Sequence, residues 1–469
     1  MFSIPSKKVF KSFLVFLSLV GFAIIVNPWT NIDILLLLIT ALVASYIFLQ
    51  EKLLLVFLII RPTLDHWRDY PLITYQGTVI NLNSTLSILL LIWCIFIVLR
   101  YRVRLKNHLF LLSAFFLSLL TLLSSLYSVD PFTSLIESLK LYNIFFLFIA
   151  GYILIKAEKI SLQEIFFTTI LSAIVPILTG LYQLITGTGL TTDDIHGRIL
   201  GTLAHPNVFA FLVLWLLFFY VQFTHITKKY LSSKKIQNII GGFLFLLLLF
   251  TYTRAALLGF LIFLGCIGLI KYRKIFFIST GTLILLYGLF FPINALIRNT
   301  TSYDLQNISV ISRLTARSED ADSISWRSSV TRESIPIGLK KPFFGYGYGT
   351  FPVVWENFRG DEHLWDSGVE AHDDYLRLFV EVGSIGLFLY LMFIVSFIFF
   401  VGKNITKEPK EKYLLFGWVI TFALLSLSDN MLHHTPVMWP MWTLWGAMVA
   451  NYYKEKLFDW SPENVLESK

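Results

Sequence analysis

The chain has 469 residues, of which 56% are hydrophobic, 16% aromatic and only 14% charged, and its mean hydropathy is +0.70. This composition excludes an ordinary soluble globular protein. The formal net charge is +8, but the basic residues lie in separate short clusters, which argues against a nucleic-acid-binding surface. Cys94 and Cys266 lie inside apolar runs and indicate neither a disulfide nor a metal site.

Apolar runs long enough to cross a hydrocarbon core of roughly 30 Å recur along the whole chain. We therefore predict an all-α polytopic membrane protein with about 12 to 14 transmembrane helices and one large external loop. The third run is too short to cross alone and is expected to be broken or tilted. The runs lie near residues 12–27, 31–49, 53–60, 84–99, 108–127, 137–155, 163–185, 206–224, 238–252, 255–270, 275–297, 376–402, 413–428 and 436–453.

Basic residues set the expected orientation. Lys7, Lys8 and Lys11 precede the first run, and no small-residue cleavage site follows it, which indicates an uncleaved first helix. With the amino terminus in the cytoplasm, inner loops and tails hold about 24 Lys and Arg, against about 5 outside once the long segment after Phe291 is set aside. We therefore predict cytoplasmic termini and an external segment at residues 298–371.

The predicted spans and loops divide the chain into three parts. Residues 1–185 form the N-terminal transmembrane helices, residues 186–453 form a second membrane domain that includes the external loop, and residues 454–469 form a cytoplasmic tail. No internal repeat of the kind common in transporters is found.

The outer basic residues differ in kind from the inner ones. About 11 of the 14 outer ones are arginines, whereas the inner ones are mostly lysines, although anchoring in a membrane requires no guanidinium. A guanidinium group holds two phosphate oxygens at once, so this bias fits a lipid diphosphate. For loop arginines such as Arg327, pairing with loop acids is an equally good interpretation.

Two outer arginines are harder to explain by pairing. Arg198 lies just before the eighth span, in HGRILGTLAHPN, where Pro206 suits a first helical turn. His205 accompanies it, and we favour a helix-capping or interface role for this histidine over a catalytic one. Arg254 interrupts an apolar stretch, 239–270, that is too long for one span. We therefore expect Arg254 at an outer turn between two helices, pointing into the protein.

The external loop contains one helical pattern and one glycine-rich turn. In DSISWRSSVTRESIPIGLKK, Asp322 or Ser323 is a plausible helix N-cap, and Ile324, Val330 and Ile335 are expected to form an apolar face. We expect this segment to fold down onto the membrane surface. The following PFFGYGYGTF indicates a tight backbone path with its tyrosines displayed.

An Asp-Ala-Asp triplet at residues 320–322 also lies in the external loop. Such triplets arise easily by chance in charged loops, and we reject it as a metal site, so no metal is expected.

His372 lies where the external loop meets the twelfth span, next to Glu370, Asp373 and Asp374. A neutral imidazole in reach of a carboxylate is what a general base for a sugar hydroxyl requires, because the carboxylate fixes the tautomer. A structural interfacial histidine is the alternative, and residue chemistry alone leaves both open.

These segments together resemble the O-antigen ligase and polymerase superfamily of bacterial surface-glycan enzymes. The resemblance covers residues 190–450 and rests on four segments in order: GRILGTLAHPN, TRAALLGF, WRSSVTRESIPIGLKKPFFGYGYGTF and AHDDYLRLFVEVGSIGLFLYL. The family often has asparagine after the histidine, where this chain has Asp373. Either the base is tuned differently here or the position accepts both residues.

The resemblance implies a lipid-linked-sugar transferase of the GT-C-like type in the bacterial cytoplasmic membrane. It implies an undecaprenyl-diphosphate glycan donor, a glycan, lipid A core or protein acceptor, inversion at the transferred sugar, and neither metal nor cofactor. Arg198 and Arg254 match the arginines thought to hold the donor diphosphate, and His372 matches the histidine thought to activate the acceptor. Arg327, Asp373, Asp374 and His205 are further candidate substrate contacts.

A repeat-unit flippase or another polytopic transporter is the competing interpretation. It would predict charged residues deep within several helices, whereas the exceptional polar residues here gather on one face of the membrane. Polymerase and ligase activities are not separated by the sequence. A bias toward Lys, Ile and Phe indicates an AT-rich genome, and a host with a single membrane would lack a lipopolysaccharide core, which favours polymerisation.

Overall fold

A computed structural model of the chain describes residues 50–75, 78–192, 195–222, 234–271, 323–358, 369–404, 409–453 and 455–460, with isolated positions between 273 and 297. The predicted spans at 12–27 and 31–49, and most of 275–297, lie outside the described residues.

Most of the remaining predicted spans are helices in the structure. In chain order the larger ones are α3 (Leu53–Thr63), α4 (Leu82–Arg100), α5 (Leu109–Ser124), α6 (Pro131–Lys156), α7 (Leu162–Thr186), α8 (Pro206–Gln222), α10 (Lys234–Phe250), α11 (Arg254–Lys271), α16 (Asp374–Asn404), α17 (Pro409–Leu425) and α18 (Thr435–Tyr452). Within the described residues, α4, α6, α7 and α16 are long and apolar enough to cross a membrane, and five shorter helices are also apolar. The chain is thus a multi-pass, mainly helical membrane protein.

The centre of the bundle is built on α18 and α6. Helix α18 is buried along almost its whole length, and small residues let the two backbones approach closely. A Cβ at Gly446 would clash with the carbonyl oxygen of Phe148, and one at Gly151 would clash with that of Thr443. As predicted, the short α3 does not cross alone, and its apolar residues are buried inside the bundle.

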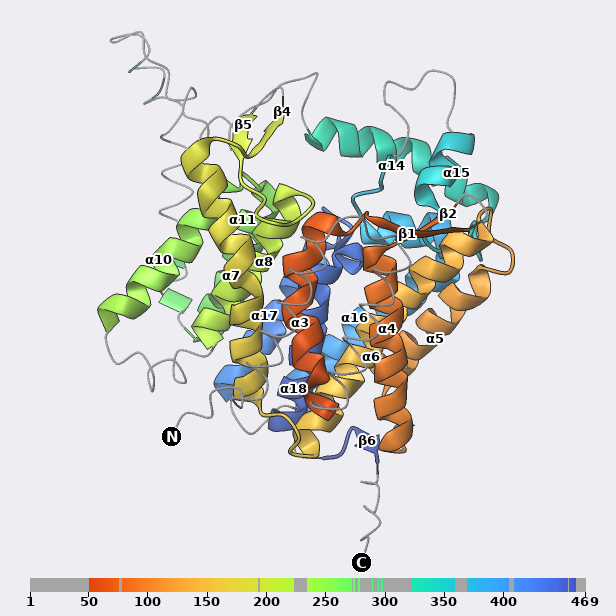
Figure 1. Cartoon of the computed structure of the whole chain (residues 1–469), viewed down its shortest axis with the longest axis horizontal. Coiled ribbons are helices and arrows are strands. Elements are labelled where there is room, and N and C mark those ends of the chain that lie inside the picture. The colour runs from red at the N-terminus through yellow and green to blue at the C-terminus, as the bar shows by residue number, and fades with distance from the viewer. Residues whose placement is uncertain are drawn as a thin grey trace, which may run out of the picture.

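Short elements gather at the two ends of the bundle (Figure 1). One end carries the hairpins β1 (Pro71–Tyr75) with β2 (Thr78–Asn81) and β4 (Leu190–Thr192) with β5 (Ile195–Arg198), and the helices α14 (Ser323–Lys340) and α15 (Phe351–Phe358) lie across it. At the other end, β3 (Arg104–Leu105) pairs with β6 (Phe458–Asp459). Three 3-10 turns complete the described chain: η1 (Gln50–Lys52), η2 (Leu64–Trp67) and η4 (Met431–His433). The basic 100–106 segment and the C-terminal segment therefore share one end, as the charge pattern predicts.

Helix α14 confirms the predicted helix but corrects its apolar face. Val330 and Ile337 are buried, together with Ser334, whereas Ile335 is exposed. Positions 330, 334 and 337 recur at helical spacing on one side, but a residue five positions after Val330 points elsewhere.

Helix α16 is broken at Gly383, where φ is 69° and ψ is −171°. The segment after α14 packs into this break. The amide of Ser384 donates to the carbonyl oxygen of Pro342 (2.7 Å), and the amide of Gly347 donates to that of Glu381 (2.8 Å). Backbone groups freed by a helix break inside a membrane protein need such partners. The predicted display of tyrosines is therefore wrong, because Tyr346 and Tyr348 are buried where this segment enters the bundle.

Candidate functional site

The predicted base lies at the end of the bundle that α14 crosses. His372 precedes α16 by two residues and has a positive φ of 49°, a conformation that costs a histidine about 1 kcal/mol or more. Neighbouring contacts hold it there. Its side chain remains 31% exposed, so a substrate can reach the imidazole.

The carboxylate that holds His372 is Asp429, which follows α17. His372 Nδ1 lies 3.3 Å from Asp429 Oδ1, and His434 Nε2 lies 3.1 Å from the same oxygen. The sequence pointed instead to the neighbouring acids Glu370, Asp373 and Asp374 as partners of the histidine, and this is corrected. The backbone turns sharply at His372, where φ is positive. The neighbouring carboxylates therefore bond to other groups, and Asp429, which is distant in sequence, bonds to the histidine.

The charge state of Asp429 sets the tautomer of His372. Burial alone would raise the pKa of Asp429, but the charge of His434 and the hydrogen bond from His372 hold it well below the usual carboxyl range. An ionised carboxylate only accepts hydrogen bonds, so His372 Nδ1 carries the proton that it shares with Asp429. In the neutral ring Nε2 is then the basic nitrogen, which is the state that a general base requires.

Asn207, in the first turn of α8, connects this pair to Arg198. Its Nδ2 donates to Asp429 Oδ2 (2.8 Å), and its Oδ1 accepts from Arg198 Nη2 (3.3 Å). Because an amide has one donating and one accepting end, Asn207 is matched to a carboxylate on one side and a guanidinium on the other. The predicted diphosphate-binding arginine and the predicted base therefore belong to one hydrogen-bonded chain.

The turn between α10 and α11 completes the surroundings of Arg198. Arg198 Nε donates to the carbonyl oxygen of Thr251 (3.1 Å), and Nη2 approaches Thr253 Oγ1 (3.4 Å). Arg198 is 6% exposed, so the protein positions its guanidinium firmly. Arg254 follows Thr253 directly, begins α11 and is half-buried. The predicted turn between two helices at this position is confirmed.

His205 caps helix α8, as favoured from the sequence. Its Nδ1 accepts the amide hydrogen of Asn207 (3.1 Å). Burial lowers the pKa of the imidazole to about 4, although the Asp429 carboxylate opposes the shift and Arg198 adds to it. The ring is therefore neutral at pH 7 and acts as an acceptor at the start of the helix.

This lowered pKa predicts a pH-dependent stability. As pH falls from about 6.5 toward about 4, the unfolded chain takes up a proton on His205 before the folded protein does, so folding loses stability over that range. Asparagine caps helices well and does not titrate there. We expect the melting temperature of His205→Asn in detergent to fall less between pH 7 and pH 4 than that of the wild type. Equal losses in both proteins would refute the assignment.

The other candidate contacts have structural partners or stand apart. Asp373 Oδ1 accepts the amide hydrogens of Tyr375 (2.8 Å) and Leu376 (3.1 Å), which caps α16, and burial raises the Asp373 pKa. The buried Asp374 carboxylate accepts the amide hydrogen of Leu432 (3.2 Å). These contacts favour structural roles for both acids. Arg327 is half-buried in the first half of α14, and its predicted role stays a prediction.

Asn430 forms a second clamp next to Asp429. Its Oδ1 accepts the amide hydrogen of Asp373 (3.2 Å), and its Nδ2 donates to Glu370 Oε2 (3.1 Å). Glu370 Oε2 also lies 2.6 Å from Arg377 Nη1. Two consecutive residues thus hold both sides of the segment that carries His372, which explains how its strained backbone persists.

Sequence reasoning gave no role to Asp429, Asn430 or His434. A signal was present, because SDNMLHHTP is a dense polar run between two predicted spans on the predicted outer face. Polar residues gathered between spans on the face that already holds other functional side chains are candidates for the same site.

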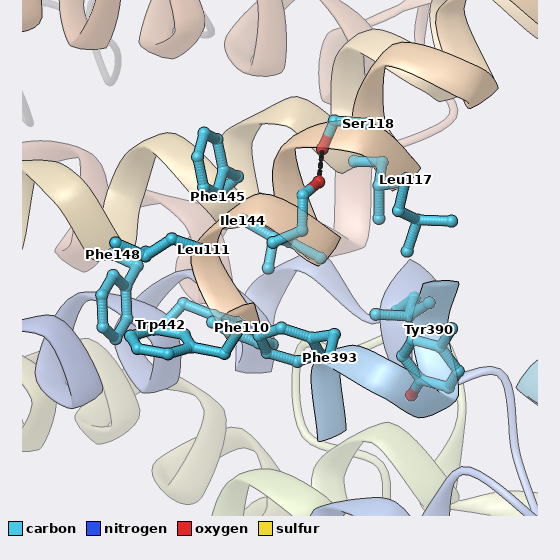
Figure 2. Close-up of a pocket in the computed structure, with 13 residues that line it drawn as sticks. Phe110, Leu111, Leu117, Ser118, Ile144, Phe145, Phe148, Tyr390, Phe393 and Trp442 are labelled. Atoms are coloured by element: carbon cyan, nitrogen blue, oxygen red, sulfur yellow. Dashed lines mark hydrogen bonds between the residues drawn. The ribbon is translucent and has the colours of Figure 1, made fainter. Parts of the chain in front are cut away.

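A separate pocket of about 40 Å³ lies between α5, α6, α16 and α18 (Figure 2). Its lining is almost entirely apolar and includes Phe110, Phe148, Phe393 and Trp442. Tyr390 at its edge bonds to Ser426 Oγ (3.0 Å). Apolar walls suit hydrocarbon and not sugar hydroxyls, so the polar cluster around His372 is the better candidate for glycan chemistry.

Comparison with known protein families gives a match to part of the sequence. Residues 239–391 match the family model described as O-antigen ligase. The matched segment contains Arg254 and His372 and lies within the predicted second membrane domain. No curated protein matches the chain significantly.

Proposed function

Because this chain carries an O-antigen ligase domain and falls in the O-antigen ligase and polymerase superfamily of surface-glycan assembly, we propose that it transfers an undecaprenyl-diphosphate-linked oligosaccharide to an acceptor glycan. The reaction takes place on the outer face of the bacterial cytoplasmic membrane. The enzyme is an inverting glycosyltransferase of the GT-C-like type that uses no metal, and residues 298–371 form its external loop. One observation carries the proposal: Arg198, Asn207, Asp429 and His372 form a continuous hydrogen-bonded chain.

The proposed chemistry assigns one task to each end of that chain. His372 Nε2 takes the proton of an acceptor hydroxyl while the hydroxyl oxygen forms a bond to the anomeric carbon of the donor. The bond from that carbon to the diphosphate oxygen breaks, and its electron pair leaves with the lipid diphosphate. Arg198 and Arg254 stabilise the negative charge as it accumulates on the leaving group. The N-terminus of α11, where Arg254 stands, also favours an anion.

Asp429 serves both tasks in this proposal. It keeps Nδ1 of His372 protonated and stabilises the imidazolium that forms, and through Asn207 it fixes the amide that faces Arg198. Polymerisation of repeat units is our preferred activity over ligation to a lipid core, for the reasons of composition given above.

Purified protein in detergent, supplied with lipid-linked oligosaccharide from the same cells, tests the proposal. A ladder of longer lipid-linked glycans is expected from a polymerase, and a single transfer to an added acceptor is expected from a ligase. Movement of donor across proteoliposome membranes without any new glycosidic bond would refute glycosyl transfer and support a flippase.

Lysine at either donor arginine tests bidentate diphosphate binding. Arg198→Lys and Arg254→Lys keep the charge but lose the planar fork, so we expect product formation to fall roughly 10- to 100-fold with normal expression. Arg273→Lys is the matched control, because Arg273 is exposed and stands beyond the opposite end of α11. Near wild-type product formation by both site variants would refute diphosphate binding by Arg198 and Arg254.

Cysteine labelling tests the proposed orientation. In a background without Cys94 and Cys266, Ser318→Cys should react with a membrane-impermeant maleimide in intact cells, and Ser232→Cys should react only after permeabilisation. The reverse pattern would invert the topology, place the site on the cytoplasmic face and refute the proposed outer-face reaction.

A further inference from the structure

Glu370 is a carboxylate that the proposed transfer step does not use. It lies two residues before His372, and its side chain is 40% exposed. Arg377 Nη1 (2.6 Å) and Asn430 Nδ2 (3.1 Å) both donate to the same oxygen, Oε2. Among the described residues, the second oxygen, Oε1, accepts no hydrogen bond. The group is thus fixed at one oxygen and open at the other.

The burial pattern directs Glu370 and His372 to the same side. The residue between them, Ala371, is 1% exposed and packs in the small core that also holds Val330 and Ile337, whereas both its neighbours are partly exposed. The partners of the two side chains, Asn430 and Asp429, are consecutive, so their Cα atoms are about 3.8 Å apart. The exposed carboxylate and the base are therefore held by adjacent residues at the same end of α16.

The ion pair with Arg377 does not by itself explain this carboxylate. Arg377 already contacts Glu381 at 3.0 Å, and Glu381 is fully buried. The contacts with Arg377 and Asn430 engage only Oε2 of Glu370, so they leave its exposed Oε1 unexplained. What Arg377 and Asn430 do achieve is to hold Glu370 in one orientation beside the base.

We propose that Glu370 binds the acceptor: its Oε1 accepts a hydrogen bond from a second hydroxyl of the acceptor sugar while His372 takes the proton of the attacking hydroxyl. The proposal rests on the proposed function and narrows it to an acceptor class. That class is a sugar with a free hydroxyl close to the one that is glycosylated. A carboxylate or phosphate substituent at that place would be repelled by Glu370.

The test compares Glu370→Gln with Glu381→Gln. Both variants remove one negative charge from the partners of Arg377, but only the first changes the exposed oxygen. The acceptor is an oligosaccharide from partial acid hydrolysis of the polymer that the wild type makes. For Glu370→Gln we expect a 10- to 100-fold higher KM for this acceptor, with donor binding and kcat within a few-fold of wild type. For Glu381→Gln we expect a lower melting temperature and an acceptor KM within a few-fold of wild type.

A second measurement uses acceptors that each lack one hydroxyl. With the wild type, one of them should lose 10- to 100-fold in kcat/KM, and with Glu370→Gln that penalty should disappear. If Glu370→Gln does not accumulate as folded protein, Glu370→Asp, which keeps the charge but retracts the oxygen, replaces it in both assays.

Three results would overturn the proposal. An unchanged acceptor KM in Glu370→Gln shows that Glu370 does not touch the acceptor. A fall in kcat without a change in KM assigns it to the transition state, and losses that match those of Glu381→Gln assign it to the fold. Absence of product from the wild type would instead overturn the proposed function, so the two failures are distinguishable.

Discussion

A His372→Gln enzyme is expected to bind the lipid-linked donor and to make no detectable glycan. General-base assistance is worth about 10² to 10⁴ in rate, and glutamine cannot take a proton at neutral pH. Its amide can still approach Asp429, which bonds His372 in the wild type at 3.3 Å. Folding and the Asn207 to Arg198 contacts should therefore survive. The measurement scores donor binding and product formation separately on purified protein.

His434 provides the matched control for this variant. It contacts the same oxygen of Asp429 (3.1 Å) but is less exposed than His372, at 16% against 31%. If only the shared carboxylate mattered, His434→Gln and His372→Gln would have equal effects. We expect the His434 variant to keep at least a tenth of the wild-type rate. A His372→Gln rate within a few-fold of wild type would show that His372 positions the acceptor and that the arginines and substrate alignment carry the reaction.

The sequence predicted the membrane helices well because hydrophobic length is a local property. From α4 to α18, most predicted runs agree with helices to within a few residues, and the turn before Arg254 was found because a charge and excess length coincide there. The same argument anticipated the short α3. Local signals of this kind need no knowledge of which helices are neighbours in space.

The parts of the site that were missed depend on long-range contacts. Asp429 lies 57 residues after His372 and 222 residues after Asn207, so no spacing rule joins them. The acids next to His372 in sequence were natural partners to expect, yet Asp373 and Asp374 accept backbone amides instead. A turn at positive φ redirects the chain between His372 and the helix, and sequence pattern does not predict such a turn at histidine.

The prediction of exposed tyrosines in the 342–351 segment was wrong for a related reason. Its glycines at 345, 347 and 349 all have positive φ, as a tight path requires. The tyrosines were expected on the surface because the segment reads as a loop. The break at Gly383 opens backbone groups inside the bundle, and this segment supplies their partners, which carries Tyr348 to a contact with His433 (3.3 Å). A broken helix and its partner segment can be recognised only together.

Asp429→Asn is expected to reduce product formation about 10²- to 10⁴-fold and to weaken donor binding as well. Asp429 Oδ1 accepts from His372, from His434 and from the Asn430 amide, so the carbonyl of a new asparagine would stay there. Its NH₂ group would then face the NH₂ group of Asn207, which donates to Oδ2 in the wild type. If Asn207 turns over to relieve this clash, it presents its NH₂ group to Arg198. The contact between two hydrogen-bond donors is thus transferred from the Asp429 side of Asn207 to the Arg198 side.

The double variant Asp429→Asn with Asn207→Asp separates the two effects. A carboxylate at position 207 accepts from the new amide at position 429 on one side and from Arg198 and Thr253 on the other. The donor–donor clash therefore disappears, and the negative charge is moved from position 429 to position 207. We expect donor affinity and melting temperature to recover toward wild type. Product formation should stay low, because His372 still faces an amide that cannot stabilise an imidazolium as a carboxylate does. Recovery of product together with donor binding would show that Asp429 acts only through Arg198, and no recovery of donor binding would show that the connection through Asn207 does not reach the donor.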